Sequence, residues 1–329
     1  MSKQKLIPII KCTSRNRVIH LTVIAVGLMT LVPFVLNDYQ ISLGTEVMIF
    51  ALYALGINVL LGYTGYVSLG HAMFLGIGGY GLAILSVLWG WPVWAAVPAT
   101  FLIGAILGGV IGFACLRVGK IQFLVLTLAF SQMLSGAFTK LKATGGTDGM
   151  AGIPRPDLAW LGVDSWNNDI FYLYVLTFFL VVTFTLYRVL HSPFGSVLVG
   201  IRENERRMVA LGYRTGRYKI GAFAISGFVA TVAGLLLAQR TGFATPDYMS
   251  WSYSGEGILM VIIGGMQSFS GPILGAGFYV LAKAGLADIT DEYIVVFGLL
   301  FMIVVAGFRT GLSGLIKVIL TWRTRNERT

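Results

Sequence analysis

Long apolar stretches separated by short polar connections dominate the chain. Most of them reach the roughly 17–25 residues that a helix needs to cross a bilayer, and they lack the alternation over about ten residues that marks membrane β-strands. The pattern therefore predicts an all-α polytopic membrane protein. We expect spans at 18–36, 41–62, 67–89, 93–116, 121–139, 169–190, 217–239, 254–266, 270–287 and 292–309.

Two of these segments leave the number of transmembrane helices open between about eight and ten. The segment 254–266 is too short for a full crossing, and together with 270–287 it forms either a re-entrant pair or one broken helix. Short, glycine-interrupted segments of this kind often mark transport pathways. The first segment, 18–36, exceeds the usual length of a signal-peptide core, so we interpret it as a retained anchor.

Composition and charge agree with a membrane protein of defined orientation. Only 12% of the 329 residues are charged and 56% are hydrophobic, whereas soluble domains carry about 25% charged residues. The net charge is +10, and 19 of the 24 basic residues lie before residue 18, in 117–120, in 188–219 or from 309 onward. Positive charge marks the cytoplasmic side. Both termini are therefore expected in the cytoplasm, and this placement explains the charge without a nucleic-acid partner.

This topology divides the chain into a basic cytoplasmic tail (1–17), a transmembrane domain (18–309) and a second basic tail (310–329). Within the transmembrane domain, an external loop at about 142–168 contains turn-forming residues. This loop is either a solvated connector or a docking or substrate-entry loop. The other long connection, at about 191–217, is expected to be cytoplasmic.

A short polar helix is predicted within this cytoplasmic loop. Ser192-Pro193 ends the preceding span, Arg202, Arg206 and Val209 then recur at helical spacing, and Gly212 is a plausible stop signal. The spacing alone leaves two interpretations equally open. The helix either anchors on anionic lipid or docks against a partner.

Polar groups inside small-residue segments form a second set of candidates. His71 lies in the stretch 62–74, among glycine, alanine and serine residues that allow close helix packing. We interpret it first as a structural histidine bonded between helices, and second as a contact for solute or water in a pathway. The same two interpretations apply to Thr64, Ser68, Thr127 and Gln132.

Several function classes lack support in the sequence. There is no phosphate-binding G-x-x-x-x-G-K-[ST] loop, no convincing Ser/His/Asp set and no clustered metal ligands, so neither an enzyme nor a metal site is expected. Glycine runs such as Gly76-x-Gly78-Gly79 lie in apolar helices and indicate helix packing. A single-chain secondary transporter or channel would need ionisable residues within spans, and apart from His71 these are almost absent. A membrane scaffold would not explain the cytoplasmic helix.

Four stretches in order give the chain its resemblance to a known family. Together they resemble the LivM-type permeases of branched-chain amino acid ABC importers, a family that also includes urea and other small-solute relatives. The resemblance covers about residues 41–315. The stretches are 62–74 (GYTGYVSLGHAMF), 127–130 with 144–149 (TGGTDG), 192–223 and 264–276. The motif residues with packing roles are Gly62, Gly65, Gly70, Gly145, Gly146, Gly264, Gly265, Gly271 and Pro272.

The resemblance implies a permease subunit in a bacterial inner membrane. Its implied partners are a second permease subunit, two cytoplasmic ATP-binding subunits that hold ATP and Mg²⁺, and a periplasmic solute-binding protein. This chain itself would bind no cofactor. The helix at 202–212 then resembles a coupling helix that fits a groove of the ATPase. Its implied coupling residues are Arg202, Glu203, Glu205, Ala210 and Gly212.

The chain departs from the family pattern in the coupling helix. Arg206, Arg207 and Met208 stand where the family tends to carry small or apolar residues, which would suit a particular ATPase partner. The implied solute is a branched-chain amino acid, with urea, amides and small aromatic acids as alternatives.

Overall fold

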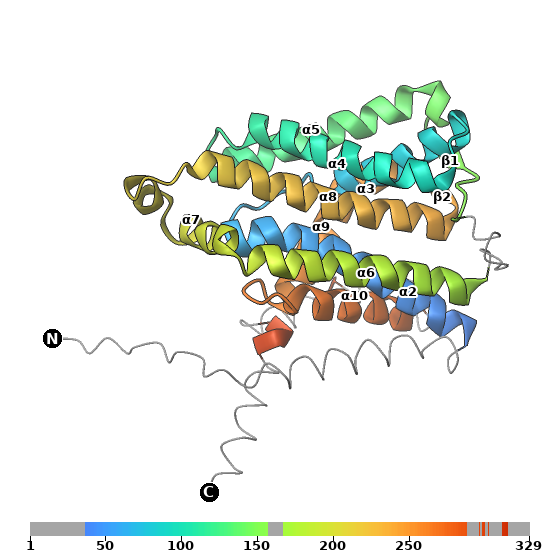
Figure 1. Cartoon of the computed structure of the whole chain (residues 1–329). Helices are drawn as coiled ribbons and strands as arrows, with labels where there is room; N and C mark the ends of the chain where they lie inside the picture. The colour runs from blue at the N-terminus through green and yellow to red at the C-terminus, as the bar shows by residue number, and fades with distance from the viewer. Residues whose placement is uncertain are drawn as a thin grey trace, which may run out of the picture.

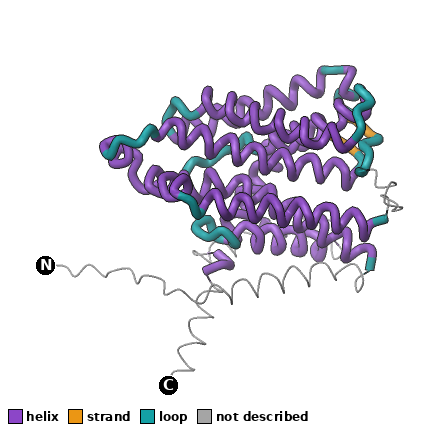
Figure 2. Tube along the Cα trace, viewed as in Figure 1, coloured by secondary structure: helices purple, strands orange, loops and turns teal. Residues whose placement is uncertain are grey.

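A computed structural model describes residues 37–156 and 167–287, four single positions between 296 and 302, and 311–314. The predicted span 18–36 and both basic tails, apart from 311–314, lie outside the described residues, as does most of 292–309. The described chain is almost entirely helical, which confirms the predicted fold class (Figures 1 and 2).

Nine α-helices are described, and two of them continue as π-helices. They are α2 (Asp38–Asn58) with η2 (Val59–Thr64), α3 (Ala72–Ala83) with η3 (Ile84–Leu88), α4 (Val93–Cys115), α5 (Lys120–Lys140), α6 (Asn168–Leu190), α7 (Pro193–Ala210), α8 (Thr215–Thr241), α9 (Trp251–Gly264) and α10 (Gly271–Ala287). Five of the described helices are long and apolar enough to cross a membrane, and two shorter helical segments, Ala72–Leu88 and Gly271–Ala287, are also apolar.

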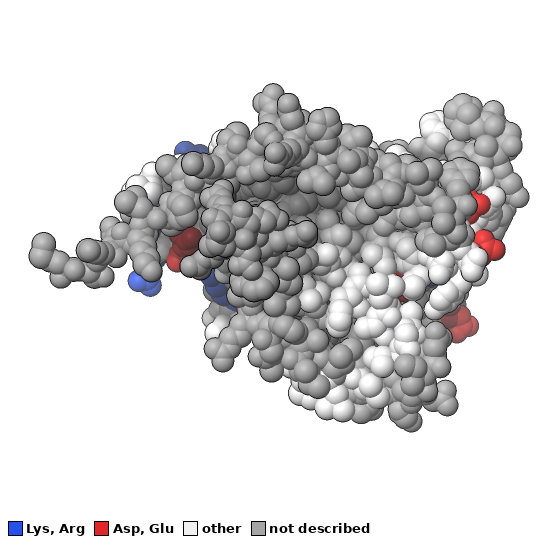
Figure 3. Space-filling view, turned by 90° about the horizontal axis from the view of Figure 1, so that it is seen from below, with Lys and Arg blue, Asp and Glu red and all other residues white. Residues whose placement is uncertain are grey.

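The helices run side by side, so the bundle has two distinct ends (Figure 1). At one end lie α7 and the turn that leads from it into α8, which we call the α7 end. At the other end, which we call the β end, β1 (Met150–Ala151) pairs antiparallel with β2 (Phe243–Ala244) in a small two-stranded sheet. Charged atoms visible in Figure 3 gather mainly toward these two ends, with uncharged residues between them.

The core of the bundle forms where α3 crosses α8. The two backbones approach closely because Gly78 faces the carbonyl of Thr231, and Gly234 of α8 faces the carbonyl of Leu75. A side chain at either glycine would collide with backbone, which has no alternative rotamer. The packing role predicted for the glycine run at 76–79 is therefore confirmed at Gly78. Small residues at crossing points are the usual way for membrane helices to pack.

The predicted span 67–89 needs a correction, because helix α3 begins only at Ala72. Gly65 adopts a left-handed conformation (φ 72°) that ends η2, and residues 65–71 run without a regular helix. We call 65–71 the entry segment. It ends beside Ser226, which lies 11 residues into α8 and therefore about 16 Å along that helix. Apolar composition alone could not show this break.

The pair 254–266 and 270–287 forms two separate helices, α9 and α10, joined by a turn at 265–270. Helix α9 has 14 residues and is about 21 Å long, which is shorter than the roughly 30 Å hydrocarbon core of a bilayer. Its first turn meets the start of α3, since the Ser254 hydroxyl accepts a hydrogen bond from the Ala72 amide at 2.9 Å. Two helices thus begin next to each other inside the bundle.

The α3–α8 crossing gives a first testable prediction. Gly78→Ala places a methyl group against the α8 backbone and should lower the melting temperature in detergent by several degrees. Gly109→Ala in α4 is the matched control, because that position has open space around it. It should be neutral or slightly stabilising. Equal melting temperatures for the two variants, measured by size-exclusion chromatography after heating, would contradict the packing argument.

Candidate functional site

Helix α7 is positioned by strong local signals at both ends. Its N-terminus is capped by the Ser192 hydroxyl, which accepts a hydrogen bond from the Phe194 amide at 3.2 Å, and Pro193 occupies the first turn. At the C-terminus Gly212 is left-handed (φ 88°). The amide of Gly212 bonds to the Val209 carbonyl and that of Tyr213 to the Met208 carbonyl. This is the glycine-ended helix stop that the sequence predicted.

The helix starts earlier than predicted and contains a break. Asn204 has an extended backbone (φ −158°, ψ 94°) between two helical parts. Its side-chain oxygen accepts a hydrogen bond from the Arg207 amide at 3.0 Å, so it caps the second part. Asparagine competes for backbone partners in this way. The continuous 202–212 helix is therefore corrected to one that starts at Pro193 and bends at Asn204.

The second part of α7 places Glu205 at the centre of a polar cluster. Its Oε1 lies 2.8 Å from Lys219 Nζ and accepts a hydrogen bond from the Thr215 hydroxyl at 3.2 Å. Its Oε2 accepts a hydrogen bond from the Tyr66 hydroxyl at 3.3 Å. Lys219 Nζ also donates to the Tyr66 hydroxyl at 3.1 Å. We call Tyr66, Glu205, Thr215 and Lys219 the polar cluster.

The cluster is partly shielded from solvent, and its charges compensate one another. The Lys219 side chain is 8% exposed and that of Glu205 is 32% exposed. Partial burial by itself would raise the pKa of Glu205, but the hydrogen bond and positive charge of Lys219 outweigh it and hold that pKa below its ordinary value. The carboxylate is therefore charged at neutral pH. Its stabilising effect is lost only as the pH falls through this lowered pKa.

A second set of contacts, made by Arg202, joins α7 to the end of η2. The Arg202 guanidinium donates a hydrogen bond to the Gly62 carbonyl, and the stem of Arg202 packs against Gly65. Tyr66 of the polar cluster follows immediately. Helix α7 is thus fastened to the start of the entry segment, more than 130 residues away in the chain.

Aromatic rings continue this connection to His71. Tyr66 packs edge-on against Phe123 with ring centroids 5.2 Å apart, Phe123 against Phe223 at 5.8 Å, and Phe223 against His71 at 5.8 Å. Phe74 closes the group against both His71 and Phe223. A contiguous row of rings therefore runs from the polar cluster to the inner end of the entry segment.

His71 is fully buried and bonded to α8. Its Nε2 lies 2.7 Å from the Ser226 hydroxyl oxygen, and that hydroxyl donates its own proton to the Gly56 carbonyl. Ser226 can therefore only accept from His71, which places the imidazole proton on Nε2. Nδ1 has no partner within the described structure. The contacts match the structural interpretation of His71, and a contact with solute stays a prediction.

The other predicted pathway residues lie in different surroundings. Thr64 and Thr127 are buried and bond to carbonyls of their own helices, and Ser68 is buried without a hydrogen-bond partner in the described part of the chain. Gln132 is exposed on α5. Thr64, Ser68, His71 and Thr127 therefore lie inside the bundle, and Gln132 lies on its surface.

The predicted coupling and packing residues are placed as follows. Arg202 and Glu205 face the bundle, whereas Glu203, Ala210 and Gly212 are exposed. The packing glycines divide into close contacts and left-handed turns. Close backbone or side-chain contacts occur at Gly62, Gly70, Gly264 and Gly271, and positive φ angles at Gly65, Gly145, Gly146 and Gly265. Pro272 is buried in the first turn of α10.

Sequence reasoning missed Tyr66 and Lys219 as site residues. Lys219 carried one usable signal, because a lysine in the first turns of an otherwise apolar helix needs a counter-charge. The sequence could not show that the partner is Glu205. The pairing depends on the bend at Asn204, which turns Glu205 toward α8.

Five helices that are long and apolar enough to cross a membrane define the class of a multi-pass membrane protein. The chain belongs to the family of permease components of branched-chain amino acid transport systems, whose model matches residues 41–327. This confirms the resemblance found in the sequence. The chain is thus a multi-pass membrane permease, and its relatives are transport subunits rather than enzymes.

Two kinds of permease from the same transport system are among its relatives. The high-affinity branched-chain amino acid permease proteins LivM of Salmonella typhimurium and of Escherichia coli are each 30% identical to the chain over 288 residues, covering 81% of the chain and 68% of the relative. The companion permease LivH of Escherichia coli is 24% identical over 289 residues, covering 80% of the chain and 91% of the relative. No solved structure matches the chain.

The polar cluster gives a second prediction. Lys219→Met removes the buried cation and leaves the Glu205 carboxylate without its main partner. The loss should destabilise the protein by roughly 1.5–3 kcal/mol. Lys120→Met is the matched control, since Lys120 is exposed, its Nζ lies 5.5 Å from the centroid of the Tyr66 ring, and it takes part in neither of the described ion pairs. Equal unfolding temperatures for the two variants in detergent would show that the ion pair adds nothing to stability.

Proposed function

We propose that this permease forms one half of the membrane pathway of an ATP-driven importer for branched-chain amino acids. In this proposal a solute-binding protein delivers the amino acid from outside, and a LivH-like permease supplies the other half. Two cytoplasmic subunits bind ATP and Mg²⁺ and drive transport. The support comes from the family match over residues 41–327 and from relatives of both the LivM and the LivH kind.

The proposed orientation places the α7 end in the cytoplasm of a bacterial inner membrane. Basic residues concentrate at this end of the described bundle, as expected for a cytoplasmic face. Those of the α7 end are Arg117, Lys120, Arg188, Arg202, Arg206, Arg207, Arg214, Arg217 and Lys219, and those toward the β end are Lys140, Lys142, Arg155, Arg240 and Lys283. The acidic residues Asp38, Asp148, Asp169 and Asp247 lie near the β end.

Helix α7 is the proposed docking element for the ATP-binding subunits. A helix that only anchored on lipid would need no specific tie to the bundle, whereas α7 is held by Arg202 and by the polar cluster. These ties leave its other side free, and Glu203, Ala210 and Gly212 are exposed there. Movement of the ATPase would therefore displace α7 together with the segments to which it is bonded.

The contacts of Arg202 and Glu205 also suggest which segment would move with α7. Arg202 and Glu205 hold Gly62 and Tyr66, which flank the left-handed turn at Gly65. Displacing α7 would pull on the entry segment and on the start of α8 together. Because the entry segment has no regular helix, fewer backbone hydrogen bonds within it would have to break for it to change conformation. We propose that it responds to the ATPase.

The proposed pathway residues Thr64, Ser68, His71 and Thr127 lie along or beside this segment. The unpartnered Ser68 hydroxyl and His71 Nδ1 are the polar groups with capacity for a solute or water. Gln132 would face the second permease subunit, because an amide exposed to lipid at mid-membrane is costly.

The alternatives predict different behaviour. A single-chain secondary transporter would need ionisable groups at membrane depth, and the described ion pairs, Lys219–Glu205 and Arg240–Glu46, lie toward the helix ends.

Urea, amides and small aromatic acids remain the competing solutes within the family. They differ from a branched-chain amino acid in lacking its combination of two charges and an apolar side chain.

The docking proposal gives a third prediction. Glu205→Lys reverses the charge at the centre of the polar cluster, and Gly212→Pro disrupts the helix stop. Either variant should insert into membranes but abolish the ATPase activity that a loaded binding protein stimulates in the reconstituted complex. Arg117→Glu is the control for charge reversal at the same end of the bundle, since Arg117 is exposed and lies outside α7. Normal stimulation in Glu205→Lys together with normal uptake would overturn the proposed transmission.

The solute gives a fourth prediction. Vesicles that contain the complete importer should accumulate radiolabelled leucine when ATP is enclosed, and excess unlabelled isoleucine or valine should reduce that uptake at least tenfold. Excess urea or benzoate should leave it unchanged. Uptake that persists without ATP-binding subunits would instead favour the single-chain transporter.

A further inference from the structure

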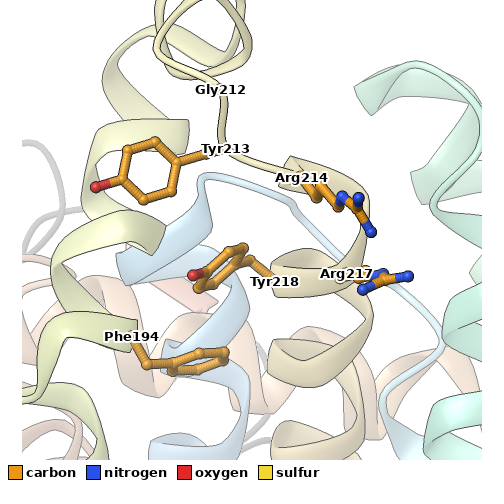
Figure 4. Close-up of a pocket in the computed structure, with 6 residues that line it drawn as sticks. All are labelled: Phe194, Gly212, Tyr213, Arg214, Arg217 and Tyr218. Atoms are coloured by element: carbon orange, nitrogen blue, oxygen red, sulfur yellow. The ribbon is translucent and has the colours of Figure 1, made fainter.

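The turn between α7 and α8 carries a pocket of about 480 Å³ that the polar cluster does not use. It is lined by Phe194, Gly212, Tyr213, Arg214, Arg217 and Tyr218 (Figure 4). A second hollow of about 550 Å³ shares Tyr213 and Tyr218 and extends to His191. The two hollows therefore flank the same pair of tyrosines.

The aromatic wall of the pocket is built from two helices. Tyr218 of α8 stacks on Phe194 of α7 with ring centroids 5.7 Å apart. Tyr213 meets Tyr218 edge-on at 6.2 Å. Tyr213 is 41% exposed, so its ring is accessible to an apolar group of a binding partner. Its position is fixed because the left-handed stop at Gly212 sets the direction in which the chain leaves α7.

The basic wall comes from the first residues of α8. Figure 4 shows the Arg214 and Arg217 side chains on one side of the helix start and the three rings on the other. Both arginines are exposed, and neither pairs with a carboxylate within the described residues. The amino end of a helix adds further positive potential. Two guanidinium groups in this position suit a carboxylate, which arginine binds in a bidentate manner.

The surface around the pocket is apolar as well as basic. Leu211, in the turn, is 66% exposed, and Val209, in the last turn of α7, is 56% exposed. Arg206 and Arg207 are exposed beside them. Contiguous exposed apolar side chains with a charged rim mark a protein interaction surface. We call Arg206, Arg207, Val209, Leu211, Tyr213, Arg214 and Arg217 the turn surface.

We propose that the turn surface receives an acidic segment of the ATP-binding subunit, whose carboxylates pair with Arg214 and Arg217 and whose neighbouring apolar side chain rests on Tyr213 and Tyr218. This inference rests on the proposed function and adds the chemistry of the partner. The two exposed arginines that lack a carboxylate partner within the described residues and the exposed apolar side chains support it. The turn between α7 and α8 also projects furthest from the bundle among the described elements (Figure 1).

The test uses the permease in nanodiscs and its ATP-binding subunits in solution. The double variant Arg214→Glu with Arg217→Glu should bind the ATP-binding subunits at least tenfold more weakly than wild type at low salt. The difference in affinity should become smaller at high salt, because exposed charges are screened. Leu211→Ser should weaken association by a similar factor at all salt concentrations. Folding should be retained, since an acidic residue at the start of α8 favours the helix dipole.

Arg117→Glu is the matched control, an exposed arginine at the same end of the bundle that packs over Phe113. It should leave association unchanged. Equal affinity for wild type and the double variant would overturn the inference. A loss seen only in nanodiscs of anionic lipid, and absent in zwitterionic ones, would also overturn it and assign the arginines to lipid. Failure of the wild type to bind any ATP-binding subunit would instead contradict the proposed function.

Discussion

A lysine buried at the start of an apolar helix requires an opposite charge, and in this permease that requirement joins three distant segments. Lys219 is 8% exposed, and an unpaired ammonium there would be strongly unfavourable. Glu205 supplies the charge from α7, and Tyr66 supplies a hydroxyl from the entry segment. Because each partner needs the other two in place, the cluster fixes how α7, α8 and the entry segment lie relative to one another.

The entry segment is the second constraint, because backbone without a helix is tolerated at membrane depth only when protein satisfies it. Several contacts meet this need here. The Tyr66 amide bonds to the Leu60 carbonyl, the carbonyls of Gly70 and His71 accept hydrogen bonds from the first turn of α3, and the Ala72 amide bonds to Ser254. A segment supported in this way is ordered, yet it has fewer backbone bonds to break than a helix. This makes it a suitable moving part in a transport cycle.

Helix α7 connects the entry segment to the outside of the bundle. One side of α7 is tied to Gly62 and to the polar cluster, and the turn that follows presents exposed arginine and apolar side chains. A partner held on that turn would act on the entry segment through short polar contacts, without rearranging the α3–α8 core. At Gly78 helices α3 and α8 are packed too closely to shift gradually against each other.

The sequence determined much of this protein by itself. Its apolar runs fixed the helical class, the glycine stop at Gly212 fixed the end of α7, and the four motifs indicated the family. The start of α7 at Pro193, the bend at Asn204 and the extension of the non-helical connection to residue 71 were not predicted, because apolar composition and helical spacing do not reveal them. Only the tertiary structure decided that Glu205 faces Lys219. That pairing depends on backbone direction at single residues and on contacts between segments far apart in the chain, which local patterns do not encode.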